Sequence, residues 1–218
     1  MKFFLDTANL DELDRALAWG IIDGVTTNPT LIAKEGIAMC EQLRRICERT
    51  DGDVSAPVIS SVSRDMVHEG RELASLHGNI VIKVPMTEEG IKAVSALRSD
   101  GIRTNVTLCF TAAQALIAAK SGAYFVSPFF ARVEDAGGSG QQLIEDIARI
   151  YSAHGFATQI LAASLRSREH VEQAAKAGAH IATLPFKLME SLFRHPLTAQ
   201  GIEQFASDYS KVFDPVKA

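Results

Sequence analysis

Short apolar runs rich in β-branched residues alternate with longer stretches of helical spacing along the whole chain. Eight runs have the length and composition of strands: Phe3–Thr7, Ile22–Thr27, Val54–Ser60, Ile80–Pro85, Arg103–Leu108, Tyr124–Pro128, Thr158–Ala163 and His180–Leu184. Helical spacing lies between them, most clearly at Leu10–Trp19, Arg64–Leu76, Gly90–Ser99 and Ala112–Ser121. The pattern predicts a strand-then-helix unit that is repeated along the chain.

Polar residues and glycines mark the ends of the predicted helices. Two pairs have the spacing of a capping box, Asn9 with Glu12 and Ser139 with Gln142. Glycines shortly before strands are typical helix ends, and four occur here: Gly101, Gly122, Gly155 and Gly178.

Repeated units of this kind fit a closed (β/α)8 TIM barrel, whose lower size limit is about 200 residues. The alternative, a doubly wound open sheet, needs fewer strands and usually a glycine-rich loop with G-x-G-x-x-G spacing. Residues 137–140 (Gly-Gly-Ser-Gly) lack that spacing and are better interpreted as a link into a capped helix. We predict an α/β fold, a single-domain barrel over residues 1–218, with an extra C-terminal helix at 201–213 that packs on a neighbouring subunit.

Composition and charge narrow the choice of partners. The net charge of the 218 residues is −4, so no basic field is present to neutralise a nucleic-acid backbone. The apolar runs are shorter than the roughly 18 residues of a membrane span, and Asp6 interrupts any signal-peptide pattern. We therefore expect a soluble, cytoplasmic protein that binds neither nucleic acid nor membrane.

The three cysteines, Cys40, Cys47 and Cys109, have neither metal-binding nor redox spacing. Cys40 and Cys47 share one face of a predicted helix, where cysteine usually acts as a small buried hydrophobe. We expect structural thiols in a reducing compartment, no metal site and no cofactor.

Polar residues spaced by two occur late in several strands, where a parallel barrel is normally apolar. Three pairs consist of polar residues, Thr26 and Asn28, Asn105 and Thr107, and Ser164 and Arg166, and in the fourth Ser127 is followed at the same spacing by the aromatic Phe129. One such pair is usually a turn cap, but four in register indicate a lined cavity at the face where barrels carry their chemistry.

Lys83 interrupts the apolar strand Ile80–Pro85. A lysine can protect an exposed strand edge, but a closed barrel has no edge. Burial is costly for a lysine unless it is paired or loses its proton, and a neutral amine can attack a carbonyl to form a Schiff base. The pattern favours Lys83 as a nucleophile.

Three further charged residues lie at predicted strand ends. Asp6 fits a helix cap or a general acid/base equally well. Arg132 and Arg166, with Ser164 beside them, could hold a phosphate dianion through charge-assisted hydrogen bonds. The alternative is a pair of ordinary surface arginines.

These residues lie in segments that resemble the small transaldolase and fructose-6-phosphate aldolase family over nearly the whole chain. The segments are Phe4–Asn9 (FLDTAN), Gly24–Pro29 (GVTTNP), Val81–Thr87 (VIKVPMT), Thr104–Leu108 (TNVTL), Tyr124–Phe129 (YFVSPF) and Ile160–Arg166 (ILAASLR). The conjunction is specific, although each segment alone is not.

The resemblance implies a metal-free Schiff-base mechanism in a (β/α)8 barrel that assembles into pentamers or decamers. Lys83 matches the Schiff-base lysine, Asp6 the acid/base at the C4 hydroxyl, and Thr107 the threonine that holds the catalytic water. The remaining matches are contacts of the sugar phosphate, with Asn28, Asn105 and Ser127 at the dihydroxyacetone unit and Arg132, Ser164 and Arg166 at the phosphate.

Within the family, Phe129 stands where the aldolase branch has a tyrosine that protonates the enamine. A phenyl ring has no such proton, so the resemblance favours transfer from fructose 6-phosphate or sedoheptulose 7-phosphate to an aldose phosphate. A lyase, an enzyme for another anionic sugar and a non-catalytic sugar-phosphate binder are the alternatives.

One departure from the family pattern lies at Pro57, 26 residues before Lys83, where the family has glutamate or glutamine. That side chain orients the water used in forming and hydrolysing the Schiff base. Proline has no side-chain donor or acceptor and removes a strand N–H. We expect slow turnover or an unusual substrate as the consequence.

Overall fold

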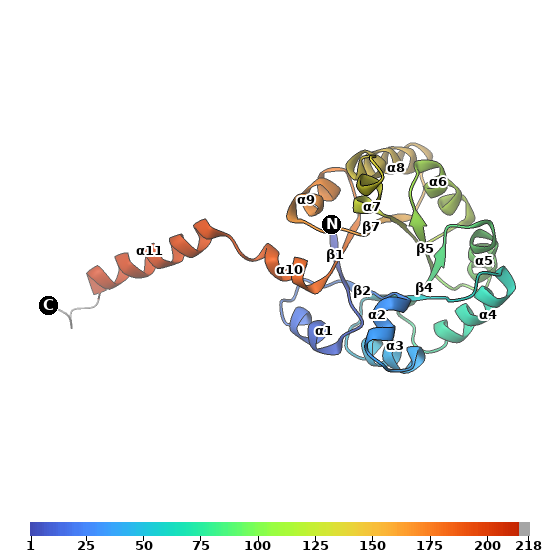
Figure 1. Ribbon diagram of the computed structural model, residues 1–218, viewed down its shortest axis with the longest axis horizontal. Helices are drawn as coiled ribbons and strands as arrows, with labels where there is room; N and C mark the ends of the chain where they lie inside the picture. The colour runs from blue at the N-terminus through green and yellow to red at the C-terminus, as the bar shows by residue number, and fades with distance from the viewer. Residues whose placement is uncertain (214–218) are drawn as a thin grey trace.

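Parallel strands of the computed structural model, which describes residues 1–213, close into a barrel with the helices on its outside (Figure 1). The strands follow the chain order and are β1 (Lys2–Asp6), β2 (Gly24–Thr26), β3 (Asp53–Pro57), β4 (Ile80–Pro85), β5 (Thr104–Cys109), β6 (Phe125–Pro128), β7 (Gln159–Ala162) and β8 (Ile181–Leu184). β1 pairs with β8 and closes the ring. The predicted barrel is confirmed and the open sheet is wrong, while the last five residues of the predicted domain, 214–218, lie outside the described residues.

The helices are α1 (Leu10–Leu17), α2 (Pro29–Lys34), α3 (Met39–Cys47), α4 (Ser63–Ala74), α5 (Glu88–Ser99), α6 (Ala112–Ser121), α7 (Phe130–Asp135), α8 (Gly140–His154), α9 (Arg168–Lys176), α10 (Phe186–Leu192) and α11 (Pro196–Phe213). Four helices, α1, α4, α5 and α6, begin and end within two residues of the bounds predicted for them. Asn9 and Ser139 accept the expected capping hydrogen bonds, at 3.0 and 3.1 Å. The four predicted helix-ending glycines all have positive φ, as a left-handed C-terminal residue requires.

The barrel holds two apolar cores. The larger one lies between strands and helices, and the smaller one comprises Phe4, Val81, Phe125, Leu161, Ala163 and Ile181. Gly24 leaves room for this inner core, because a Cβ there would lie 2.6 Å from the Phe4 ring. Since side chains alternate along a strand, the residues two positions further on share the same face. The inner core thus supports a polar layer nearer the carboxyl ends of the strands, which includes Asp6, Lys83, Ser127 and Thr183.

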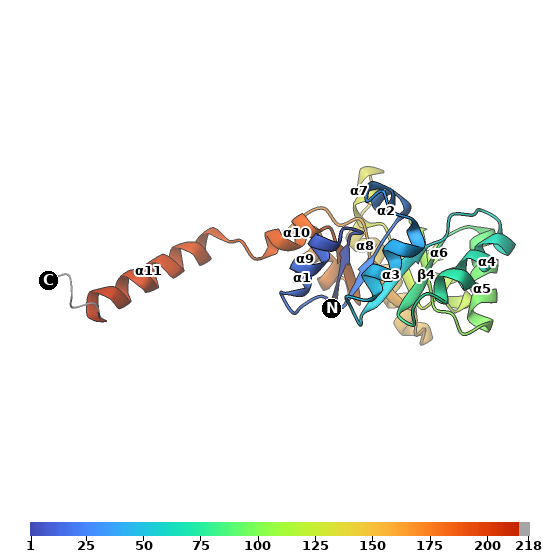
Figure 2. The ribbon, with the colours of Figure 1, turned by 90° about the horizontal axis from the view of Figure 1, so that it is seen from below.

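The last helix, α11, extends away from the barrel (Figures 1 and 2). It begins at Pro196 rather than at Gly201, because proline is well suited to the first position of a helix. Large apolar side chains along it are exposed, including Leu197, Ile202 and Phe205. Across residues 1–213, no helix combines the length and the apolar character that crossing a membrane requires.

One cysteine departs from the prediction. Cys47, in the last turn of α3, is buried, and burial raises the pKa of its thiol to about 11. Cys40 lies in the first turn of the same helix and is exposed, so its predicted burial is wrong. Sharing a helix face therefore did not secure burial, although Gln42 in the same turn is buried and donates to the Ala8 carbonyl. Cys109 ends β5 and is buried.

Candidate active site

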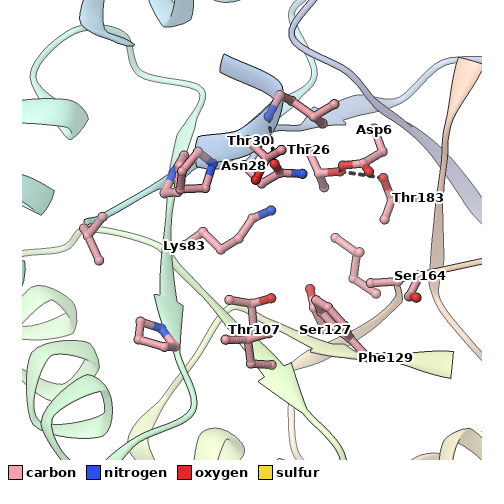
Figure 3. A pocket seen from close by; sticks show the side chains of 18 of the residues that line it. Asp6, Thr26, Asn28, Thr30, Lys83, Thr107, Ser127, Phe129, Ser164 and Thr183 are labelled. Carbon is pink, nitrogen blue, oxygen red and sulfur yellow. Dashed lines mark hydrogen bonds between the residues drawn. The ribbon is translucent and has the colours of Figure 1, made fainter. Parts of the chain in front are cut away.

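A cavity of about 580 Å³ opens at the carboxyl ends of the strands. Its lining includes Asp6, Thr26, Asn28, Pro57, Lys83, Thr107, Ser127, Phe129, Arg132, Ser164 and Thr183. Figure 3 shows Lys83 reaching across this space, with Asp6, Thr26 and Thr183 on one side and Thr107 and Ser127 on the other. The structure therefore brings together most of the residues that the sequence identified as candidates.

Lys83 lies on β4, in register with Pro57 on one side and Asn105 on the other. Its Nζ donates a hydrogen bond to the carbonyl oxygen of Thr27. Burial lowers the pKa of Lys83 below its ordinary value of 10.5, and the negative charge of Asp6 opposes this shift. The environment therefore increases the fraction of neutral, nucleophilic amine.

Asp6 ends β1 and lines the cavity rather than capping a helix, since Asn9 caps α1. The Thr26 hydroxyl donates to Asp6 Oδ1 at 2.7 Å and also contacts the Thr183 hydroxyl at 2.6 Å. Sequence reasoning missed Thr183. The available signal was a threonine two residues after the buried Ile181, the spacing that marked the other polar strand ends.

A buried network lies beside the lysine. The Ser127 hydroxyl donates to Asn105 Oδ1 at 2.7 Å, and Asn105 Nδ2 donates to the Ser55 hydroxyl at 2.9 Å. Asn105 is fully buried, so a ligand in the cavity reaches this network through Ser127, which lines the cavity. Ser55 was also missed, and its role here is to hold the Asn105 amide in one orientation.

Two residues at the cavity have left-handed backbone conformations: Leu108, near the end of β5, and Ser164, in the loop after β7. Leu108 has φ 58° and Ser164 has φ 62°, and both line the cavity. Such conformations cost non-glycine residues about 1–3 kcal/mol and cluster at functional sites. The strain places the Ser164 side chain in the cavity, as the sequence predicted.

Asn28 has a second role that limits what it can offer a ligand. Its side-chain oxygen accepts a hydrogen bond from Leu31 N at 2.9 Å and so caps α2. Because that oxygen is engaged, the amide nitrogen is the group that can donate to a ligand in the cavity.

The two candidate phosphate-binding arginines differ in position. Arg132 lines the cavity, and its guanidinium lies 4.9 Å from the ring centre of Phe129. Arg166 is not part of the lining. It forms two hydrogen bonds to the Asp135 carboxylate, at 2.9 and 2.7 Å, which lower the pKa of Asp135. An anion in the cavity would therefore meet Arg132 directly and would have to compete with Asp135 for Arg166.

Pro57 leaves the expected carboxylate missing beside the lysine. Asp6 is the one carboxylate that the described lining contains. The Thr27 N–H donates to the Ser55 carbonyl oxygen. In a regular parallel ladder the Thr27 carbonyl oxygen would then accept from the N–H of residue 57, which proline lacks. Lys83 donates to that carbonyl oxygen instead.

Groups of His, Cys, Asp and Glu side chains ligate metal ions in proteins. In the part of the chain described, no group of three or more such side chains could hold a metal ion.

The fold and site define the class: a (β/α)8 barrel whose carboxyl-end cavity is lined by a partly buried lysine, Lys83, and by the carboxylate of Asp6. Residues 3–216 match the model of the Transaldolase/Fructose-6-phosphate aldolase family, and the chain belongs to that family. It is 54% identical over 211 residues to a "Probable transaldolase" of Kosmotoga olearia, covering 97% of each chain. It is 56% identical to that of Thermoanaerobacter sp. and 54% identical to that of Aquifex aeolicus, covering 97% of this chain and 98% of each relative.

The charge of Asp6 predicts a pH effect on the lysine. In Asp6→Asn, Lys83 loses the negative neighbour that raises its pKa, so the protonated amine becomes less favourable. We expect the pH midpoint for borohydride trapping of dihydroxyacetone on Lys83 to move to lower pH, since neutral amine is then present at lower pH. The midpoint is independent of the amplitude of trapping. An unchanged midpoint, or one at higher pH, would show that Asp6 does not act on this amine.

Proposed function

We propose that the protein is a Schiff-base transaldolase that moves a dihydroxyacetone unit from a ketose phosphate to an aldose phosphate. The observation that carries the proposal is the partly buried Lys83 amine, whose pKa burial lowers, in a cavity whose described lining contains one carboxylate, Asp6. Membership of the family and the names of the relatives support an activity of this type.

The reaction starts when neutral Lys83 Nζ attacks the C2 carbonyl of the donor. The resulting carbinolamine loses water and becomes a Schiff base. Asp6 then takes the proton of the C4 hydroxyl as the C3–C4 bond breaks, so an aldose phosphate leaves and the electron pair stays on C3 as an enamine on Lys83. An acceptor aldose phosphate, such as erythrose 4-phosphate, adds to C3 and receives the proton back from Asp6 at its new hydroxyl. Water then hydrolyses the Schiff base.

Transfer is favoured over lysis by the chemistry of Phe129, which lines the cavity and packs against Phe110 and Arg132. A phenyl ring cannot protonate the enamine, so the three-carbon unit is retained until an acceptor arrives. The test is to supply fructose 6-phosphate without an acceptor. We expect no sustained release of dihydroxyacetone, and its steady accumulation would instead assign a lyase.

The anionic end of the substrate is assigned to Arg132 and Arg166, with Ser164. We expect Arg132→Ala to raise KM for fructose 6-phosphate about 10–100-fold, the scale of a lost charge-assisted hydrogen bond, with a far smaller effect on dihydroxyacetone. Arg166→Ala has the same direction and a smaller size, because Asp135 already competes for this guanidinium. Equal effects on the charged and uncharged donors would remove the assignment. The arginines would suit another anion, so a sugar with a different anionic tail belongs in the same assay.

We also propose a homo-oligomer, a pentamer or decamer, in which α11 packs on a neighbouring copy. The exposed apolar side chains of α11, such as Leu197, Ile202 and Phe205, support this arrangement because their burial would be favourable. Sedimentation of the purified chain gives the number of copies, and a monomer would contradict the role of α11.

The three free cysteines fit a reducing, cytoplasmic location, which we propose for the protein.

A further inference from the structure

The hydroxyl groups of Thr183 and Thr26 form a chain of hydrogen bonds that ends on the carboxylate of Asp6. Asp6 lies on β1, Thr26 on the neighbouring β2, and Thr183 on β8, which flanks β1 on its other side. The two contacts measure 2.7 Å from Thr26 to Asp6 Oδ1 and 2.6 Å from Thr26 to Thr183. Both threonines are buried, and Figure 3 shows the three side chains together on one wall of the cavity.

The number of protons fixes the direction of this chain. A threonine hydroxyl has one hydrogen to donate, and Thr26 donates it to Asp6. The proton in the contact between the two threonines must therefore come from Thr183. Hydrogen bonds in series polarise one another, so donation from Thr183 strengthens the bond that Thr26 gives to the carboxylate.

The same chain can serve Asp6 in its second protonation state. When Asp6 has taken a proton from the substrate hydroxyl and holds it on Oδ1, the acid donates to Thr26. Thr26 then donates to Thr183, which turns its own O–H towards the cavity that it lines. Only hydroxyl rotations are needed, no proton changes its owner along the chain, and the carboxyl group keeps its place.

We infer that Thr183 is a positioning residue for Asp6, holding the carboxyl group in place through Thr26 while it exchanges a proton with the substrate. This inference rests on the proposed function, because it concerns the cleavage and formation of the C3–C4 bond. Thr183 does not itself touch the reacting atoms.

The test compares three variants that change little in shape. Thr183→Val removes the hydroxyl, and Thr183→Ser retains it. Thr104→Val is the matched control, because Thr104 is a buried threonine on β5 whose hydroxyl has no hydrogen-bond partner. We expect Thr183→Val to lower kcat for transfer about 10-fold with KM nearly unchanged, the upper end of the scale for one lost hydrogen bond between neutral groups. Thr183→Ser restores most of the rate and Thr104→Val retains it. Should Thr183→Val not fold, Thr183→Ala, which only removes atoms, takes its place.

Two readouts separate positioning from a structural role. Borohydride trapping of dihydroxyacetone on Lys83 needs no C3–C4 cleavage, so Thr183→Val should leave it unchanged. In an Asp6→Asn background, the loss caused by Thr183→Val should disappear, because no acid/base remains to be positioned. An equal loss in both backgrounds, or full activity of Thr183→Val, would overturn the inference. A wild-type protein that neither transfers nor is trapped would instead overturn the proposed function and the inference with it.

Discussion

Replacing Lys83 by methionine is expected to lower kcat/KM for transfer by about 10⁴-fold or more, the scale found when a covalent nucleophile is removed. Methionine has a similar length and fills the space with an apolar side chain, but it cannot form a Schiff base. Because burial disfavours the charged amine, we expect the variant to unfold at the same temperature as the wild type or at a higher one.

The control for this variant is Lys92→Met on α5. Lys92 is exposed and forms surface ion pairs with Glu88 and Glu89, so its removal should leave the transfer rate unchanged. Steady-state transfer from fructose 6-phosphate to erythrose 4-phosphate measures both variants. A folded Lys83→Met protein that retained transfer would exclude the Schiff-base mechanism.

The second large effect is a higher kcat in the variant Pro57→Glu. Formation of the Schiff base requires a proton for the carbinolamine oxygen as it leaves as water, and a positioned acid/base contributes about 10²–10⁴-fold to such a step. Pro57 lines the cavity in register with Lys83, so a glutamate there would place a carboxylate beside the nucleophile. We expect kcat on fructose 6-phosphate with erythrose 4-phosphate to rise by about 10²-fold, with little change in KM.

Pro57→Ala is the matched control, since it restores the strand N–H without adding a carboxylate. That N–H would share the Thr27 carbonyl with Lys83, so any effect of the backbone alone appears in this variant. Neither substitution should lower the unfolding temperature, because a strand N–H regains an acceptor. A folded Pro57→Glu protein that is no faster than Pro57→Ala would show that this position does not limit the reaction.

The barrel could be predicted from the sequence because its strands and helices are marked by local patterns. Capping side chains such as Asn9 and Ser139 act on residues three positions away, and the alternation of strands and helices repeats along the chain. The short helices α2 and α7 were not predicted, because one or two turns carry too little periodicity to be distinguished from a loop. The restriction of the fold to one domain stays a prediction.

The candidate site was predictable where a polar residue interrupts an apolar strand. Lys83 and Asp6 were found in this way, and the structure places both in the cavity. The partners that set their properties come from strands far away in the chain, as with Thr183, and no local pattern links them to Asp6. The ion pair between Arg166 and Asp135, 31 residues apart, was invisible for the same reason.

The most direct test of the central claim is reduction with borohydride in the presence of fructose 6-phosphate and no acceptor, followed by peptide mapping. We expect a stable adduct on the peptide that contains Lys83, formed by reduction of the Schiff base with the sugar, and no such adduct in Lys83→Arg. The absence of an adduct in the wild type, or an unchanged adduct in Lys83→Arg, would contradict the Schiff-base mechanism.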